Sequence, residues 1–146
     1  MTQLMHIVYA SEATVPFTDD SVKELLLRAR AHNASLDVSG ILLLIDRSFF
    51  QILEGTAEAV EPLYEKIARD RRHKRVVRLL AEPIDERDFR DWSMGLAKVT
   101  SRELAALPGF SDFFVRRATL DALSEGMTRR LLGEFRAGKW RARVEA

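Results

Sequence analysis

The sequence predicts an α+β fold in which one face of a β-sheet carries two helices. Short apolar or alternating stretches, typical of strands, are separated by two stretches with apolar residues at helical spacing. Their order along the chain is β-α-β-β-α-β-β, and the remaining C-terminal part is helical in pattern. A chain of 146 residues is long enough to bury a real core in one domain.

The first strand and the first helix place two polar side chains on apolar surfaces. Residues 4–10, LMHIVYA, predict a strand with Met5, Ile7 and Tyr9 on one face. Thr18 or Asp19 can cap a helix that runs to about His32. Its apolar stripe consists of Val22, Leu25, Leu26 and Ala29. One further turn of this stripe leads to Asn33, so an amide is expected to face the core.

The next two strands are predicted to form a hairpin. Residues 38–45, VSGILLLI, are uninterruptedly apolar, which suggests that both faces of this strand are covered. The polar break at 46–48 is followed by FFQIL, in which Gln51 interrupts an apolar strand. A buried amide without a partner costs about 2–7 kcal/mol, so Gln51 must bind the protein, water or a ligand.

A second helix and two more strands complete the sheet. Gly55 and Thr56 precede the helix, whose apolar residues are Val60, Leu63, Tyr64 and Ile67. Pro62 is expected either near the first turn or at a bend. The basic segment 69–75 ends the helix favourably for its dipole. Strands are expected at 76–84 and 93–99, with a loop at 85–92 between them.

This order is the split βαβ arrangement of ferredoxin-like folds with one added strand. In that topology the first and third strands are neighbours at the centre of the sheet. Tyr9 and Gln51 would then lie on adjacent strands, beneath the helices that carry Asn33 and Ile67. The sequence therefore predicts a pocket between the sheet and the two helices.

The C-terminal part is expected to be a helical extension. A short capped helix at SRELAAL is followed by an amphipathic pattern formed by Leu120, Leu123, Met127, Leu131 and Phe135. Gly126 and Gly133 weaken this helix as an independent unit, so it is expected to cover the free face of the sheet or to meet a partner. The tail GKWRAR is expected to fray. We thus divide the chain into residues 1–98 and 99–146.

Composition narrows the classes of function. A net charge of +1 predicts no strong attraction to nucleic acid or membrane. Without cysteine there can be no disulfide or thiolate chemistry, and no metal site is predicted. The N-terminus lacks the pattern of a signal peptide, and the aliphatic run 41–45 is too short to span a bilayer. We expect a cytoplasmic protein.

Five strings of the sequence belong together: IVYAS around Tyr9, AHNASLDVSGILL around Asn33, SFFQILEG around Gln51, RDRRH at 69–73 and FRDWSMG at 89–95. Together they resemble one family, the BLUF domains, which sense blue light with FAD. They occur in the family's order and spacing, over roughly residues 3–98. The chain resembles the short, single-domain type.

The resemblance implies a role for each residue at the pocket. Leu25 and Ile67 would hold the flavin ring between the helices, and Asn33 would hydrogen-bond the O4/N3 edge of the ring. Gln51 would bridge the ring and the phenol of Tyr9. Arg72 would contact the other ring carbonyl, and Asp70 and His73 would hold the ribityl or phosphate side. Trp92 and Met94 would compete for the place beside Gln51 and relay the signal.

Taken singly, the same residues have simpler interpretations. Gln51 is often satisfied by backbone or water in a strand, Asn33 is common at helix ends, and Tyr9 is an ordinary core residue. His6 is expected to be structural. Trp92 and Met94 are most often packing residues.

The resemblance implies a photoreceptor without enzymatic activity, in which light drives electron and proton transfer from Tyr9 and rearranges the hydrogen bonds of Gln51. The resemblance implies a separate effector, such as a cyclic-di-GMP phosphodiesterase or a transcriptional regulator, and a homo-oligomer. The alternative is a small flavin-dependent enzyme on the same fold. It would need an acid-base pair at the pocket, but the nearest carboxylate in sequence, Glu54, is expected to be solvated. An RNA-binding module is a third hypothesis, although the RNP aromatic pattern is missing.

Overall fold

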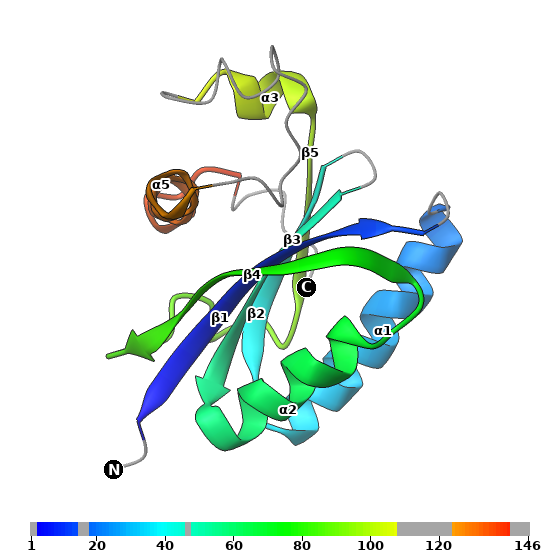
Figure 1. Ribbon diagram of the computed structural model, residues 1–146, viewed down its shortest axis with the longest axis vertical. Helices are drawn as coiled ribbons and strands as arrows, with labels where there is room; N and C mark the ends of the chain where they lie inside the picture. Colours follow the sequence, from blue (N-terminus) through cyan, green and yellow to red (C-terminus); the bar gives the residue numbers. More distant parts are fainter. Residues whose placement is uncertain (1–2, 15–17, 46–47, 108–123, 141–146) are drawn as a thin grey trace.

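A mixed five-stranded sheet forms the centre of the protein (Figure 1). The computed structural model describes residues 3–14, 18–45, 48–107 and 124–140. The strand order is β4-β1-β3-β2-β5. The strands are β1 (Leu4–Ala13), β2 (Ser39–Ile45), β3 (Ser48–Thr56), β4 (His73–Ile84) and β5 (Gly95–Val99). All neighbouring strands are antiparallel except β2 and β5, which are parallel.

The predicted fold class and the central position of the first and third strands are confirmed. Helices α1 (Asp19–Ser35) and α2 (Ala57–Ala68) lie together on one side of the sheet (Figure 1). Helices α3 (Ser101–Ala105) and α5 (Glu125–Arg136) lie on the other side. The predicted hairpin is present, because β2 pairs with β3 as far as Ile45 opposite Ser48. Leu120 and Leu123 lie outside the described residues.

Each helix begins where a hydroxyl side chain satisfies free backbone amides. Thr18, and not Asp19, is the N-cap of α1: its hydroxyl accepts a hydrogen bond from the Ser21 amide, and Ser21 completes a capping box. Thr56 caps α2 in the same way by accepting from the Ala59 amide. Pro62 lies inside α2, past the first turn, where its missing N–H removes a hydrogen bond of the helix.

The two faces of the sheet bury separate apolar clusters, because side chains alternate along each strand. The helix-face cluster lies beneath α1 and α2 and includes Ile7, Tyr9, Leu26, Phe49, Leu53, Leu63 and Met94. The opposite-face cluster joins the sheet to α3 and α5 and includes Val8, Phe50, Ile52, Phe89, Leu104, Leu131 and Phe135.

The expectation that GKWRAR frays is wrong for the part of it that the structure describes. Trp140 is buried in the opposite-face cluster, and its ring meets that of Phe135 edge to face at 5.6 Å. An indole in this position is a packing residue. Within the described ranges, no helix is long and apolar enough to cross a membrane.

Gly40 allows β2 and β3 to approach closely. A Cβ at this position would lie 2.0 Å from the carbonyl oxygen of Ile52, which is a backbone atom and cannot turn aside. Gly133 on α5 is the opposite case, because a Cβ there would meet nothing within 4 Å.

These two glycines give a matched test of the packing. Gly40→Ala should lower the free energy of unfolding by about 3 kcal/mol or more, since the clash can be relieved only by separating the strands. Gly133→Ala should raise it by about 1 kcal/mol, because alanine is the better helix former. Urea unfolding followed by circular dichroism measures both. Equal, small effects of the two substitutions would contradict this account of Gly40.

Candidate functional site

Tyr9 and Gln51 lie directly opposite each other at the centre of the sheet. They are cross-strand partners in the pairing of β1 with β3. Tyr9 belongs to the helix-face cluster, and Gln51 points to the same side, as its place among the cavity-lining residues shows. Their side chains are 0% and 8% exposed. A phenol and an amide thus lie side by side on the surface that α1 and α2 cover.

The hydroxyl of Tyr9 is a buried polar group without a partner. Among the described residues, its oxygen is the one buried side-chain N or O atom without a hydrogen bond. Burial, and secondarily the nearby Tyr64, raises the pKa of the Tyr9 phenol well above its usual value. Tyr9 is therefore neutral, and its hydroxyl can both donate and accept.

Gln51 contacts the segment that leads into β5. Its Nε2 donates to the Sδ atom of Met94 at 3.2 Å. Trp92 is half-buried on the other side of the sheet, where its ring stacks on Phe89 at 6.1 Å. Of the two residues expected to compete for the place beside Gln51, Met94 occupies it in this structure.

Helix α1 holds the same segment with two more side chains. Asn33, which is buried as the apolar stripe predicted, donates from Nδ2 to the carbonyl oxygen of Ser93 at 2.8 Å. Arg30 donates from Nε to the carbonyl oxygen of Met94 at 2.9 Å. The side-chain oxygens of Asn33 and Gln51 accept no hydrogen bond within the described part of the chain.

These residues surround a cavity of about 400 Å³ between the sheet and the two helices. This volume lies within the range typical of small-molecule sites. The cavity brings together the predicted residues Tyr9, Leu25, Asn33, Gln51, Ile67, Asp70, Arg72, His73 and Met94. Trp92 is the one predicted site residue that does not line it, since it packs on the other face of the sheet.

The polar end of the cavity is formed after α2. Asp70 accepts from Arg72 through both carboxylate oxygens, with the shortest distance, 2.5 Å, to a terminal nitrogen. This pairing lowers the pKa of Asp70 to about 2. His73 contacts the hydroxyl of Ser11 at 3.1 Å, and burial lowers the pKa of its imidazole. In this structure Arg72 is thus engaged with Asp70.

Several lining residues were not predicted from the sequence. Phe49 lies on β3 and meets His73 edge to face at 5.2 Å. Arg28, His32 and Lys66 add basic groups from both helices. The helical spacing could have predicted Arg28 and His32 as lining residues. Arg28 lies one position before Ala29 of the apolar stripe and His32 three positions after it, so both lie at the edge of the stripe.

The expectation that Glu54 is solvated is wrong. Its side chain is 0% exposed and lies on the face of the sheet opposite Gln51, because three positions along a strand reverse the direction of the side chain. Three donors surround the carboxylate: the Ser39 hydroxyl and the backbone amides of Asp88 and Phe89. It does not line the cavity.

The cavity suits the flavin that the resemblance implies. Leu25 and Ile67 offer apolar surfaces from the two helices, as a flat aromatic ring requires. The free amide oxygen of Asn33 can accept from a ring N–H, and the unpartnered hydroxyl of Tyr9 can donate to an amide or a ring acceptor. The apolar surfaces of the two helices and the free side-chain oxygens of Asn33 and Gln51 are the signs of fit, because the polar edge of a flavin ring carries an N–H donor between two acceptors.

Comparison with known proteins identifies the family of the chain. The family described as BLUF, sensors of blue-light using FAD, matches residues 4–95. A photoactivated adenylate cyclase subunit alpha from Euglena gracilis is 36% identical over 110 residues, which are 75% of this chain and 11% of that protein. This chain therefore corresponds to about a tenth of the length of that relative.

Two solved structures resemble the whole fold. The photo-activated state of BlsA has a TM-score of 0.79 at 28% identity, over 94% of this chain and 97% of the other. The dark state of the BLUF protein BlrB has a TM-score of 0.74 at 29% identity, over 94% and 98% of the two chains. The cavity, its orphaned phenol and these matches lead to one conclusion: this chain belongs to the BLUF family of blue-light sensors, which use FAD.

Proposed function

We propose that this chain is a non-covalent FAD photoreceptor in which Tyr9 and Gln51 carry the light response and a separate protein receives the signal. The observation that supports this most is the buried, unpartnered hydroxyl of Tyr9 directly across the strand from Gln51. When bound, FAD supplies the absorption of blue light and an excited state that accepts an electron.

Tyr9 would give up an electron and its hydroxyl proton. A neutral phenol is a suitable donor of both, and the raised pKa keeps Tyr9 in this form throughout the physiological range. Because water does not reach the buried hydroxyl, the proton would pass through the Gln51 amide, which would take it up at its oxygen and release another from its nitrogen towards the cofactor that holds the electron. Return of the electron and the proton to Tyr9 would complete the cycle.

Gln51 would convert this event into a change of hydrogen bonds. Its amide nitrogen now donates to the sulfur of Met94. Rotation of the amide exchanges donor and acceptor at little steric cost, and the oxygen that it would bring to Met94 could not donate to the sulfur. Tautomerisation would instead turn the oxygen into a hydroxyl donor and leave the nitrogen with one N–H and a lone pair. The contact between β3 and residues 92–94 would then be weakened, and Trp92 would relay the change on the other face of the sheet.

Leu25, Asn33, Ile67, Asp70, Arg72 and His73 would hold the cofactor and have no catalytic task. Among the described lining residues, Asp70 is the one carboxylate, and Arg72 neutralises it. A low pKa makes Asp70 a poor general base, so an enzyme at this cavity would have to use another lining group, such as His73. We therefore assign FAD binding to residues 1–98 and output to residues 99–146, acting on a separate effector or through self-association.

Absorption spectroscopy tests this function. Purified protein loaded with FAD should be yellow, and blue light should shift its flavin absorption to longer wavelength, with full recovery in the dark. The shift reflects changed hydrogen bonds at the ring and needs no turnover. Protein that cannot be loaded with flavin, or that turns over a substrate in the dark and shows no shift, would contradict the proposal.

Tyr9→Phe should keep FAD bound but abolish the reversible shift, because it removes the hydroxyl and preserves the ring. The chain contains only one other tyrosine, Tyr64, which lies 5.4 Å from Tyr9 between ring centres and carries Arg78 over its face. Tyr64→Phe is the matched control and should retain the shift. A normal shift in Tyr9→Phe would exclude Tyr9 as the donor.

A further inference from the structure

Glu54 is a buried carboxylate that the proposed photochemistry does not use. Its Oε2 accepts from the Asp88 amide at 2.7 Å, and its Oε1 accepts from the Phe89 amide at 3.0 Å and from the Ser39 hydroxyl at 3.0 Å. Burying a carboxylate is costly unless several donors surround it, and burial raises the pKa of Glu54 despite them. A glutamate at this position therefore holds two backbone amides of the 85–92 loop.

Arg87 ties the same loop to the ends of β2 and β3. It donates to the hydroxyl of Ser39 at 2.8 Å, to the carbonyl oxygen of Glu54 at 3.2 Å and to the carbonyl oxygen of Asp37 at 2.7 Å. The loop is thus fixed at three consecutive residues, 87–89, on the opposite face of the sheet from the cavity.

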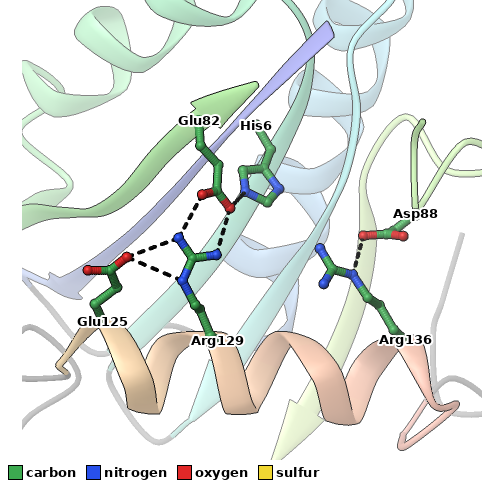
Figure 2. A network of polar contacts seen from close by, with 6 residues as sticks. All are labelled: His6, Glu82, Asp88, Glu125, Arg129 and Arg136. Carbon is green, nitrogen blue, oxygen red and sulfur yellow. Dashed lines mark hydrogen bonds and ion pairs between the residues drawn. The ribbon is translucent and has the colours of Figure 1, made fainter. Parts of the chain in front are cut away.

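This fixed part of the loop carries one polar anchor of α5, and β4 carries another (Figure 2). At the C-terminal end of α5, Arg136 donates to Asp88 at 2.7 Å, and Phe135 meets Phe89 edge to face at 6.3 Å. At the other anchor, Arg129 donates to both oxygens of Glu82 on β4, at 3.0 and 2.7 Å. Glu82 also contacts the buried His6 at 2.9 Å. One anchor rests on the loop and the other on the sheet.

The loop also leads directly to the cavity. Phe89 stacks on Trp92, and the carbonyl oxygen of Trp92 accepts from the Gly40 amide at 3.0 Å. Two residues later, Met94 receives the amide of Gln51. Gln51 and Glu54 lie on the same strand and hold the two ends of the segment 88–94 from opposite faces of the sheet.

We propose that Glu54 is a positioning residue that couples the flavin site to α5. By holding residues 88 and 89 it makes them a pivot, through which movement at Met94 reaches the ion pair of Asp88 with Arg136. This inference rests on the light response proposed above and adds its output route. Light would loosen the C-terminal end of α5, whereas the Arg129–Glu82–His6 anchor would keep the helix on the sheet.

Hydrogen exchange in residues 125–136, measured by mass spectrometry in the dark and under blue light, tests this route on the full chain with FAD bound. In the parent protein, light should increase exchange near Arg136. In Glu54→Gln, the flavin shift should be unchanged in size, while the light-dependent difference in α5 exchange should fall about tenfold, within the usual range of coupling between sites. Glutamine turns one acceptor oxygen into a donor that faces backbone N–H groups.

Two further variants distinguish coupling from general loosening. Glu82→Gln weakens the other anchor, so it should raise exchange in the dark but keep the light-dependent difference. Arg136→Gln breaks the loop anchor at an exposed site and should abolish that difference even if Glu54→Gln fails to fold. Arg136→Lys, which keeps a cation opposite Asp88, should restore part of it.

The outcomes separate the two proposals. A parent protein without a flavin shift would refute the proposed function itself. A normal shift with no change in α5 exchange in the parent, or an undiminished change in folded Glu54→Gln, would overturn only the coupling role. If Glu54→Gln does not fold, an undiminished change in Arg136→Gln would overturn it. Loss of the flavin shift in folded Glu54→Gln would also overturn it, because Glu54 would then act on the photochemistry and not on the route to α5.

Discussion

The cross-strand pair of Tyr9 and Gln51 is the constraint on which the site depends. Two polar side chains at the centre of a sheet would normally be satisfied by each other or by the backbone, and an unsatisfied buried hydroxyl costs about 1–3 kcal/mol. Here the Tyr9 hydroxyl has no partner, and the helices above it leave a cavity of about 400 Å³. A rearranged Gln51 amide is the polar group directly across the strand that could satisfy this hydroxyl.

The alternation of side chains along β3 lets one strand serve two purposes. Gln51 faces the cavity and contacts Met94, whereas Glu54 faces the other way and holds the loop that receives α5. Because both contacts come from the same central strand, one element holds both ends of the segment 88–94. This segment belongs to no strand itself, and Asn33 and Arg30 hold it from α1 as well.

Much of the fold, and the positions of the central site residues, could be predicted from local sequence patterns. The apolar stripe of α1 correctly extended to Asn33, and the ferredoxin-like order placed Tyr9 beside Gln51. What local patterns missed depends on distant parts of the chain. The sequence around Glu54 is typical of a solvated strand end, because the amides that bind its carboxylate are 34 and 35 residues away. The sequence around Trp140 is typical of a basic tail, because its partner Phe135 lies on a helix that must first pack on the sheet. Local patterns also could not decide whether Met94 or Trp92 lies beside Gln51. The answer depends on the face of the sheet to which each side chain points, and residues 92–94 lie before β5, where the alternation of a strand does not apply.

Isotope-edited infrared spectroscopy tests the central role of the Gln51 amide most directly. The chain contains only two glutamines, and the other, Gln3, is exposed and donates to the carbonyl oxygen of Ile84. Protein with FAD bound and ¹³C in its glutamine carboxamides should show label-sensitive bands in the light-minus-dark difference spectrum, and these bands should vanish in Gln51→Leu but persist in Gln3→Leu. A light-induced flavin shift with no label-sensitive band would show that the amide is a bystander and would contradict the account.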